Sequence, residues 1–300
     1  MEIRLLTYVV AIADEGSVSA AARRLSLTQP TLSRQLHELE KRLGAELFER
    51  EGRGLAPTPA GLALVERARR VIAEADAAWE DVRLAAQGRS GTLTVTFAGS
   101  GINGPLGAAL ARLRREAPRV HLRLVESFND EEMSQGVLDG AFDIAIQRFP
   151  LADRRLAARE WLREPLTLFV PQRHRLARAV GNPPAPVPAS ALGEIPLVLW
   201  PREVSPPSYD EIIAVCHRAG VVPKIAAEGR SVQTVLALVA ADFGAGVFAD
   251  SMRVLRRVGV VARPIAGTVT RQHVVCRADD ESPLVARFLE VAESVRPKAR

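Results

Sequence analysis

Residues 17–36 read SVSAAARRLSLTQPTLSRQL, and this stretch decides the fold of the N-terminal part of the chain. Ser17 and Thr28 favour helix N-caps, because a side-chain hydroxyl can accept a hydrogen bond from a free N–H group of the first turn. Pro30 is tolerated in a first turn, where its missing N–H leaves no hydrogen bond unmade. The stretch therefore predicts two helices joined by a tight turn, which is typical of a helix-turn-helix that reads DNA.

The second helix of this pair, predicted to end at Gly44, has one apolar and one polar face. Its leucines at positions 32, 36, 39 and 43 fall within about 40° of one another at about 100° per residue. Arg34 lies on the opposite face, where its paired donors can contact guanine, while Gln29 can contact adenine or a phosphate and Thr31 the methyl group of thymine. The predicted DNA-reading face consists of Gln29, Pro30, Thr31, Ser33 and Arg34.

The segment that follows, residues 47–59 (LFEREGRGLAPTP), is predicted to form a hairpin. Gly52 and Gly54 bracket Arg53 at its tip, and an arginine presented in this way can enter a minor groove. The hairpin is then the wing of a winged helix-turn-helix. The alternative is a helical bundle with a solvated hairpin.

The overall charge is a poor guide to the function of this module. The 300 residues carry a formal net charge of +5, yet residues 1–60 contain eight Lys or Arg and eight Asp or Glu. The case for DNA binding therefore depends on where the charges lie and not on their sum. Two cysteines, no signal peptide and no apolar run near the ~20 residues that cross a bilayer favour a cytoplasmic protein without membrane contact. The histidines never approach metal-ligand spacing, so no metal site is predicted.

Residues 59–86 are predicted to form one long helix, because no proline follows Pro59 and the only glycine is Gly61. Apolar residues recur along it in alternating steps of four and three, the pattern of a coiled-coil seam. Such a stripe requires a partner, which comes either from the same chain or from a second subunit. The seam consists of Leu64, Ala68, Val71, Ala75, Ala78 and Val82.

Residues 87–91 (QGRSG) follow this helix and are predicted to form a hinge.

The C-terminal two-thirds alternate between strand-like and helix-like segments, a rhythm that indicates parallel β-α-β units. The proline-dense residues 181–188 are predicted to be a loop. Both cysteines fall in apolar segments and are expected to be buried, with a peroxide-sensing dithiol as the alternative. The predicted strands are 93–98, 121–126, 142–147, 166–170, 197–200, 224–227, 246–249 and 272–277, and the predicted helices are 105–116, 130–140, 209–219, 232–241 and 283–295.

One motif in this region supports a different class of protein. Gly99, Gly101 and Gly104 fit the G-x-G-x-x-G pattern between a predicted strand and a predicted helix, and Glu126 follows about 20 residues later. This pattern would suit an NAD(P)-binding oxidoreductase or a dinucleotide-sensing regulator. No constellation of catalytic residues follows at suitable spacing, so we expect neither an enzyme nor a bound cofactor.

Residues 1–88 resemble the LysR-type transcriptional regulators. The resemblance implies a winged helix-turn-helix over residues 1–58, a linker and dimerisation helix over 59–88, and an effector-binding domain over 89–300. It also implies that the predicted face of the second helix lies in the major groove and Arg53 in the minor groove. It is based on AARRL at 21–25, QPTLSRQ at 29–35, LE at 39–40, LG at 43–44, LFER at 47–50 and LAPTPAG at 55–61.

The same resemblance, looser in this part, implies an effector domain of two Rossmann-like α/β lobes, similar to type 2 periplasmic binding proteins. Lobe I would take in about residues 91–162 and 268–300 and lobe II about 163–267, with the ligand in the cleft between them. The residues expected to bind the effector are Ser100, Gly101, Asn129, Arg148, Trp200, Pro201 and Gln233.

Individual residues of this set suggest an acidic effector. Ser100 lies at a helix start, where partial positive charge favours an anion. Arg148 can form a charge-assisted bond to a carboxylate, as in the subgroup that controls aromatic-acid breakdown; the alternative is a residue on the lobe surface. Trp200 suits either ligand stacking or core packing. Asp130 departs from the family pattern, and an acid there would repel a carboxylate. Asp242 and Ala249 depart from it too, replacing a usual glycine and proline.

Together these features predict a homodimeric or homotetrameric regulator that binds double-stranded operator DNA. Its output would be modulated by a small organic anion, with RNA polymerase as a further partner.

Overall fold

The computed structural model describes residues 2–52, 54–178 and 185–297. The chain divides into two compact units, residues 1–84 and 85–300, and each is described by itself. Arg53, predicted for the minor groove, and residues 181–184 of the predicted proline-rich loop lie outside the described residues. No described helix is both long and apolar enough to cross a membrane.

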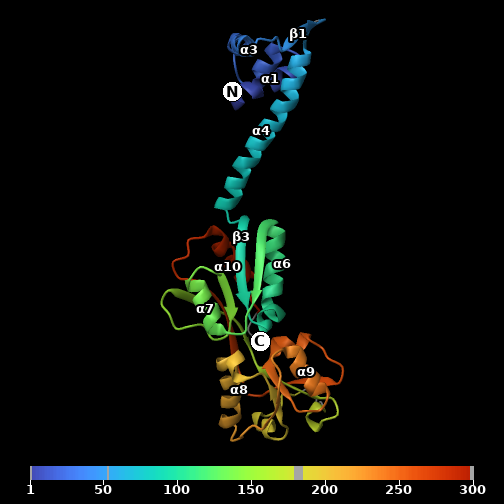
Figure 1. The fold of residues 1–300 in the computed structure, drawn as a ribbon, viewed down its shortest axis with the longest axis vertical. Coiled ribbons are helices and arrows are strands. Elements are labelled where there is room, and N and C mark those ends of the chain that lie inside the picture. The colour runs from blue at the N-terminus through green and yellow to red at the C-terminus, as the bar shows by residue number, and fades with distance from the viewer. Residues whose placement is uncertain (1, 53, 179–184, 298–300) are drawn as a thin grey trace. The chain divides into compact units, whose positions relative to one another are not determined.

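The N-terminal unit consists of three helices, a β-hairpin and the greater part of a long helix (Figure 1). Ser17 and Thr28 cap the second and third helices by accepting hydrogen bonds from the N–H groups of Ala20 and Thr31, which confirms both predicted caps. The elements are α1 (Ile3–Glu15), α2 (Val18–Arg24), α3 (Gln29–Leu43), β1 (Phe48–Glu51), β2 (Gly54–Pro57) and α4 (Pro59–Ala86).

The leucine stripe of α3 forms part of the core of this unit. Leu32 and Leu39 are fully buried, and Leu36 packs against the same cluster. Leu43 is 47% exposed, so the predicted stripe ends one turn early, where the helix stops at Gly44 in the left-handed conformation. Because the leucine side of α3 packs into the core, the polar side faces the solvent, as the sequence predicts.

The wing and the start of α4 are fixed to the helical core by backbone contacts. β1 and β2 pair antiparallel, and the N–H of Leu55 donates to the carbonyl of Gly16 at 2.8 Å. Val65 and Ala68 of α4 are buried in this unit. Further along the same helix, apolar residues are exposed. They include Val71 and Val82 of the predicted seam, and also Trp79.

In the C-terminal unit, a five-stranded sheet has the strand order β4-β3-β5-β12-β6. The strands β4, β3 and β5 run parallel, whereas β12 runs antiparallel to both of its neighbours. Helices α6 and α10 cover one face and α7 covers the other. The elements are β3 (Ser90–Phe97), α5 (Gly99–Gly101), η1 (Ile102–Leu106), α6 (Gly107–Glu116), β4 (Arg119–Glu126), α7 (Asp130–Leu138), β5 (Ile144–Gln147), β6 (Leu156–Glu164), β12 (Thr270–Arg277) and α10 (Pro283–Ser294).

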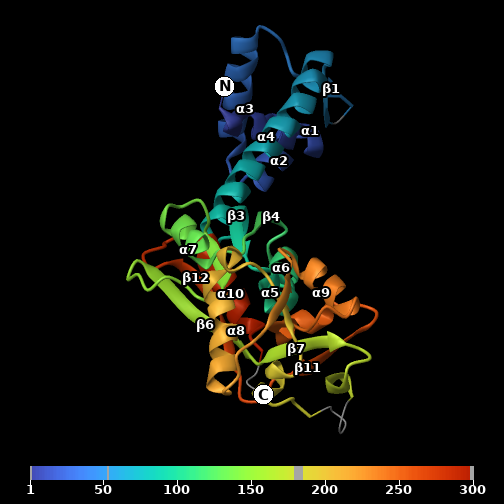
Figure 2. The ribbon, with the colours of Figure 1, turned by 60° about the horizontal axis from the view of Figure 1, so that its bottom comes forward.

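The second lobe is built on an antiparallel sheet of order β10-β7-β11 and a short parallel pair, β8 and β9. Figure 2 shows β7 and β11 side by side. Helices α8 and α9 contribute to two different core clusters of this lobe. The elements are β7 (Leu166–Pro171), η2 (Arg175–Ala177), η3 (Ala189–Gly193), β8 (Leu197–Leu199), η4 (Arg202–Val204), α8 (Pro206–Arg218), β9 (Ile225–Glu228), α9 (Val232–Ala240), β10 (Gly246–Ala249), η5 (Asp250–Val254) and β11 (Val260–Pro264).

Three expectations need correction. The sheets are mixed and not purely parallel, because β6, β7, β10, β11 and β12 form antiparallel pairs. Strands β6 and β11 have no counterpart among the predicted strands. The predicted hinge at 87–91 is also shorter, since β3 already begins at Ser90 and Gly88 is buried against Pro283, where a Cβ on Gly88 would lie 2.2 Å from the carbonyl oxygen.

Two connections join the lobes, one from β6 to β7 through Pro165 and one from β11 to β12 through residues 265–269. Thr268 binds both connections. Its hydroxyl accepts a hydrogen bond from the N–H of Leu166 at 3.0 Å and donates one to the carbonyl of Ile265 at 2.7 Å. The hydroxyl is therefore fixed between the two crossing segments.

Both cysteines are buried, as expected from the sequence. Cys216 belongs to a core cluster of the second lobe and Cys276 to the main cluster of the first. Burial raises the pKa of each thiol above its usual range, which keeps it protonated and unreactive. The two thiols lie in separate cores, so the dithiol alternative has no support in this structure.

Candidate DNA-reading face and effector cavity

The polar residues at the start of α3 stand on the surface of the N-terminal unit. Gln29, Pro30, Ser33 and Arg34 are exposed, and Thr31 is half-buried, with its hydroxyl 2.8 Å from that of Thr28. Arg34 forms no ion pair with any described residue, so its guanidinium is available to an outside acceptor. The face is compact because a single helical turn separates Gln29 from Ser33.

The acidic residues of α3 differ in their position relative to Arg34, because Glu38 lies four residues later on the same side of the helix. Glu40 turns toward the wing, where its carboxylate accepts a hydrogen bond from the N–H of Leu47 at 2.9 Å. Glu38 accepts one from the side chain of Gln35 at 3.2 Å. Glu40 is thus fixed by the backbone that leads into the wing, while Glu38 stays on the exposed surface beyond the first turn of α3.

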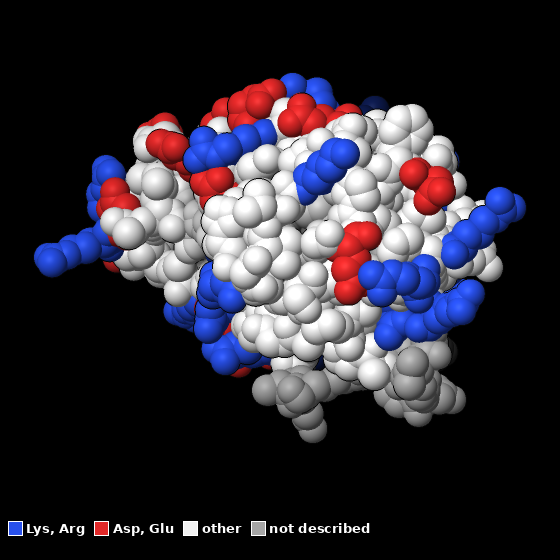
Figure 3. Space-filling view, turned by 90° about the horizontal axis from the view of Figure 1, so that it is seen from below, with Lys and Arg blue, Asp and Glu red and all other residues white. Residues whose placement is uncertain are grey.

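The surface charge of the chain does not gather into one basic patch on the face drawn in Figure 3. Lys and Arg side chains stand there among Asp and Glu, with uncharged surface between them.

The C-terminal unit contains a cavity of about 110 Å³ between the two lobes. Ser100, Arg148 and Trp200, three of the seven residues expected to bind an effector, line it. The other four expected residues, Gly101, Asn129, Pro201 and Gln233, do not line the cavity. Sequence reasoning missed several further lining residues, which are Phe128, Ser208, Glu211, Arg230, Phe248 and Met252.

Two of the four residues that miss the cavity have clear structural roles instead. Gly101 is buried beneath the turn, where a Cβ would lie 3.1 Å from the side chain of Ile146. Asn129 caps α7, since its side-chain oxygen accepts from the N–H groups of Glu131 and Glu132. Close packing therefore explains the glycine at position 101 without any bound dinucleotide.

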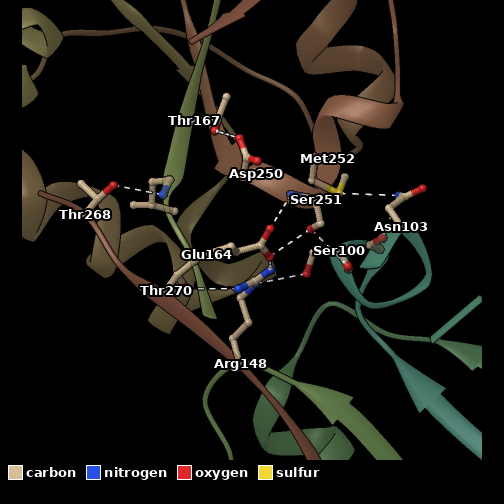
Figure 4. A network of polar contacts seen from close by, with 12 residues as sticks. Ser100, Asn103, Arg148, Glu164, Thr167, Asp250, Ser251, Met252, Thr268 and Thr270 are labelled. Atoms are coloured by element: carbon tan, nitrogen blue, oxygen red, sulfur yellow. Dashed lines mark hydrogen bonds and ion pairs between the residues drawn. The ribbon is translucent and has the colours of Figure 1, made fainter. Parts of the chain in front are cut away.

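Arg148 lies at the buried end of the cavity and is the centre of a polar network (Figure 4). Its side chain is only 8% exposed, so the alternative of a surface residue is wrong. Its guanidinium donates through Nη2 to Glu164 at 2.6 Å, through Nε to the hydroxyl of Ser100 at 3.1 Å and through Nη1 to that of Thr270 at 3.3 Å. All three nitrogens therefore have partners in this structure.

Glu164 extends this network into the second lobe. Ser251, at the start of η5, donates to the Glu164 carboxylate through its N–H and, at 3.0 Å, through its hydroxyl. The same hydroxyl lies 3.4 Å from the carbonyl oxygen of Ser100 in the first lobe. Groups that an anionic ligand at Arg148 would touch are thus connected to both lobes.

Asp130 is buried beside Arg148 but does not pair with its guanidinium. Its carboxylate accepts from the backbone N–H groups of Arg148 and Phe149 at 2.9 and 3.1 Å. Burial raises the pKa of Asp130, and these two hydrogen bonds oppose the rise. Asp130 therefore orders the turn after β5 and presents Arg148 to the cavity.

Glu211 is a second carboxyl group in the cavity wall, contributed by α8. Burial raises its pKa above the usual range, while a hydrogen bond with the Thr270 hydroxyl and the charges of Arg148, Arg218 and Arg271 oppose the rise. Among the described residues it takes part in no ion pair. Glu211 is thus a half-buried acid whose ionisation opposes folding.

We expect Glu211→Gln to make the melting temperature fall less than that of wild type as the pH rises from acidic to neutral values. Because its pKa is raised by folding, wild-type Glu211 lowers stability as the pH climbs from about 4 through the raised pKa toward about 8, whereas Gln does not titrate. The variant should therefore gain stability over wild type as the pH rises, measured by thermal melts at both ends of this range.

The neighbouring Asp210→Asn provides a control of opposite sign. Asp210 is exposed, and a hydrogen bond from Arg202 lowers its pKa. Its contribution to the stability of the fold therefore grows as the pH rises, and Asp210→Asn should lose stability relative to wild type over the same range. A constant difference between Glu211→Gln and wild type at every pH would contradict the role assigned to Glu211.

The fold and these two sites define a class of protein: a winged helix-turn-helix joined through a long helix to a two-lobed α/β binding domain. The particular family follows from comparison with known proteins. Residues 3–62 match the bacterial regulatory helix-turn-helix protein of the lysR family, and residues 86–296 match the LysR substrate binding domain. The chain belongs to the LysR family of DNA-binding transcriptional regulators with an effector-binding domain.

Individual relatives match over nearly the whole length. The HTH-type transcriptional regulator TfdS of Cupriavidus pinatubonensis is 33% identical over 97% of this chain and 98% of its own. ClcR of Pseudomonas putida is 32% identical over the same shares. The crystal structure of CbnR, a LysR family transcriptional regulator, has 29% identity and a TM-score of 0.86 over 97% of this chain and 100% of its own. These relatives are regulators and not enzymes, and they give no support to the oxidoreductase alternative.

Proposed function

We propose that this regulator reads its operator with Gln29, Pro30, Thr31, Ser33 and Arg34 in the major groove and Arg53 in the minor groove. The exposed, unpaired guanidinium of Arg34 at the start of α3 carries this proposal. A structure of full-length CbnR complexed with its target DNA, to which this chain has a TM-score of 0.81 at 28% identity over 99% of its length, supports it.

Arg34→Ala should weaken operator binding by about 1–3 kcal/mol if Arg34 makes a bidentate contact to a base. The measurement is a DNA-binding titration at fixed salt with a fragment from upstream of the gene. Arg42→Ala is the matched control, because Arg42 is equally exposed but lies in the last turn of the same helix. Equal losses for both variants would indicate a general charge effect and would contradict the assignment.

We further propose that a small organic acid binds in the cavity between the lobes and shifts the transcriptional output. Ser100, Arg148 and Trp200 are its expected contacts, and the network that connects Arg148 to both lobes carries the proposal. An effector shifts the regulator only if it binds its alternative states unequally. A ligand at Arg148 would bind different arrangements of the lobes unequally, since it would touch the network of Arg148, Glu164 and Ser251 that joins the lobes.

The exposed apolar residues of α4 support self-association. Trp79 is 76% exposed and Val82 is 65% exposed, which is costly for an isolated helix in water. We propose that α4 pairs with the same helix of a second subunit, which gives a homodimer or homotetramer with paired DNA-reading heads. Residues 1–58, 59–88 and 89–300 then act as reader, dimerisation helix and effector domain. RNA polymerase is the expected downstream partner.

A further inference from the structure

The buried end of the cavity holds more acid than base. The guanidinium of Arg148 pairs with Glu164 and is linked to Glu211 through the Thr270 hydroxyl, while Asp130 accepts from the backbone N–H of Arg148. Three carboxyl groups thus lie close to Arg148, whose side-chain nitrogens are already occupied. A ligand that brings only negative charge to this end adds to an existing excess.

Glu211 is the one of these acids that is free to contact a ligand. The Asp130 carboxylate is occupied by two backbone N–H groups, and that of Glu164 by Arg148 and Ser251. Glu211 lines the cavity, and in the described part of the chain the hydroxyl of Thr270 is the hydrogen-bond partner of its carboxyl group. A half-buried carboxyl group with so few partners is stabilised by any donor that reaches it.

Other parts of the wall suit an acid and an apolar body. Arg230 lines the cavity before α9, and its weak contact to Glu203, at 3.5 Å between highly exposed side chains, leaves it able to bind an anion. The indole N–H of Trp200 is buried without an acceptor among the described residues. Trp200 and Phe248 stand 5.7 Å apart between ring centroids and form an aromatic wall.

We propose that the effector is bifunctional: an aromatic or similarly flat organic acid that also carries an amino or hydroxyl group, which donates a hydrogen bond to Glu211. This inference rests on the proposed function, because it assumes that the cavity is the effector site. The donor contact with Glu211 is a second point of recognition, in addition to the contact of the acid group. The cavity should therefore reject an acid of the same size that has only apolar groups where the donor would be.

Three para-substituted benzoates of similar size test the proposal by isothermal titration calorimetry on the full-length chain. The compounds are 4-methylbenzoate, 4-hydroxybenzoate and 4-(aminomethyl)benzoate, which differ in the donor that they offer. At least one of the two donors should bind the wild type about tenfold more tightly than 4-methylbenzoate, the effect of one charge-assisted hydrogen bond. Glu211→Met should abolish this preference, and Glu211→Gln should weaken it.

Asp210→Asn is the matched control and should keep the preference, because Asp210 is the exposed neighbour on the same helix and does not line the cavity. If 4-methylbenzoate binds as tightly as the donors, or if the preference survives in both Glu211 variants, the inference is wrong while the proposed effector site stands. If none of the three acids binds at millimolar concentration, the organic-acid site and the inference fail together.

Discussion

Arg148→Ala should lower the free energy of unfolding of the C-terminal unit by about 3–5 kcal/mol, because it leaves the carboxylate of Glu164 buried without its cation. Both side chains are 8% exposed, so water cannot replace the lost partner. Urea unfolding followed by circular dichroism measures the loss. The double variant Arg148→Met/Glu164→Gln should recover much of it, because the uncompensated charge is gone while Ser251 keeps an acceptor.

The exposed pair of Arg202 and Asp210 provides the matched control. Its side chains are 62% and 51% exposed, and the loss of such a pair costs at most about 1 kcal/mol. Arg202→Ala should therefore leave the unfolding midpoint nearly unchanged. A loss for Arg148→Ala no greater than that for Arg202→Ala would mean that the buried network does not support the lobes.

Gly61→Ala should destabilise the N-terminal unit by at least about 3 kcal/mol and abolish operator binding. A Cβ at this position would lie 1.9 Å from the carbonyl oxygen of Leu47, and a backbone atom cannot move aside as a flexible side chain can. The contact presses the first turn of α4 against the segment between α3 and the wing. Thermal unfolding and DNA binding of the same preparation are the measurements.

Gly107→Ala tests whether the effect of Gly61→Ala comes from the close contact or from the substitution itself. A Cβ on Gly107 would lie 3.5 Å from the nearest carbonyl oxygen, that of Ile102, which is an ordinary contact. In a helix this change should be neutral or stabilising by up to about 1 kcal/mol. Equal melting temperatures for Gly61→Ala and wild type would contradict the packing described for α4.

Much of the N-terminal unit could be predicted from sequence because its signals are local. Ser17 and Thr28 lie three residues before the N–H groups that they cap, and Gly16 and Gly44 end helices in the left-handed conformation that glycine adopts most easily. The polar face of α3 follows from helical periodicity alone. Such features need no knowledge of distant parts of the chain.

The environment of Arg148 could not be predicted in the same way, because its partners come from elements far away in sequence. Glu164 ends β6, an edge strand whose charged residues come in adjacent pairs and so break the alternation by which a strand is predicted. Thr270 and Ser251 follow more than 100 residues after Arg148. Only the folded sheet order brings these side chains together.

The motif at residues 99–104 follows a strand and precedes a helix, as the sequence indicates. These residues do not form an open turn, because α5 begins at Gly99 and is followed by η1 from Ile102. The motif also suggests a cofactor, which the family does not support. Glycine at position 101 suits the close packing there, because a Cβ would lie 3.1 Å from the side chain of Ile146, which would have to shift. The same spacing can therefore arise from a close approach of backbone to sheet. A glycine pattern by itself cannot separate these two causes.

Thr268 restricts how the two lobes can move. Its hydroxyl holds the segment after Pro165 and the segment after Ile265 at fixed spacing, so the crossing chains cannot slide past one another without breaking a buried hydrogen bond. The motion that these contacts allow is a rotation of one lobe against the other, about the line through the two connections at Pro165 and residues 265–269. Arg148 contacts Glu164 and Thr270, which are paired residues of β6 and β12 next to these crossings. Because a rotation moves atoms in proportion to their distance from its axis, a small change of angle at these crossings moves the outer edges of the lobes furthest.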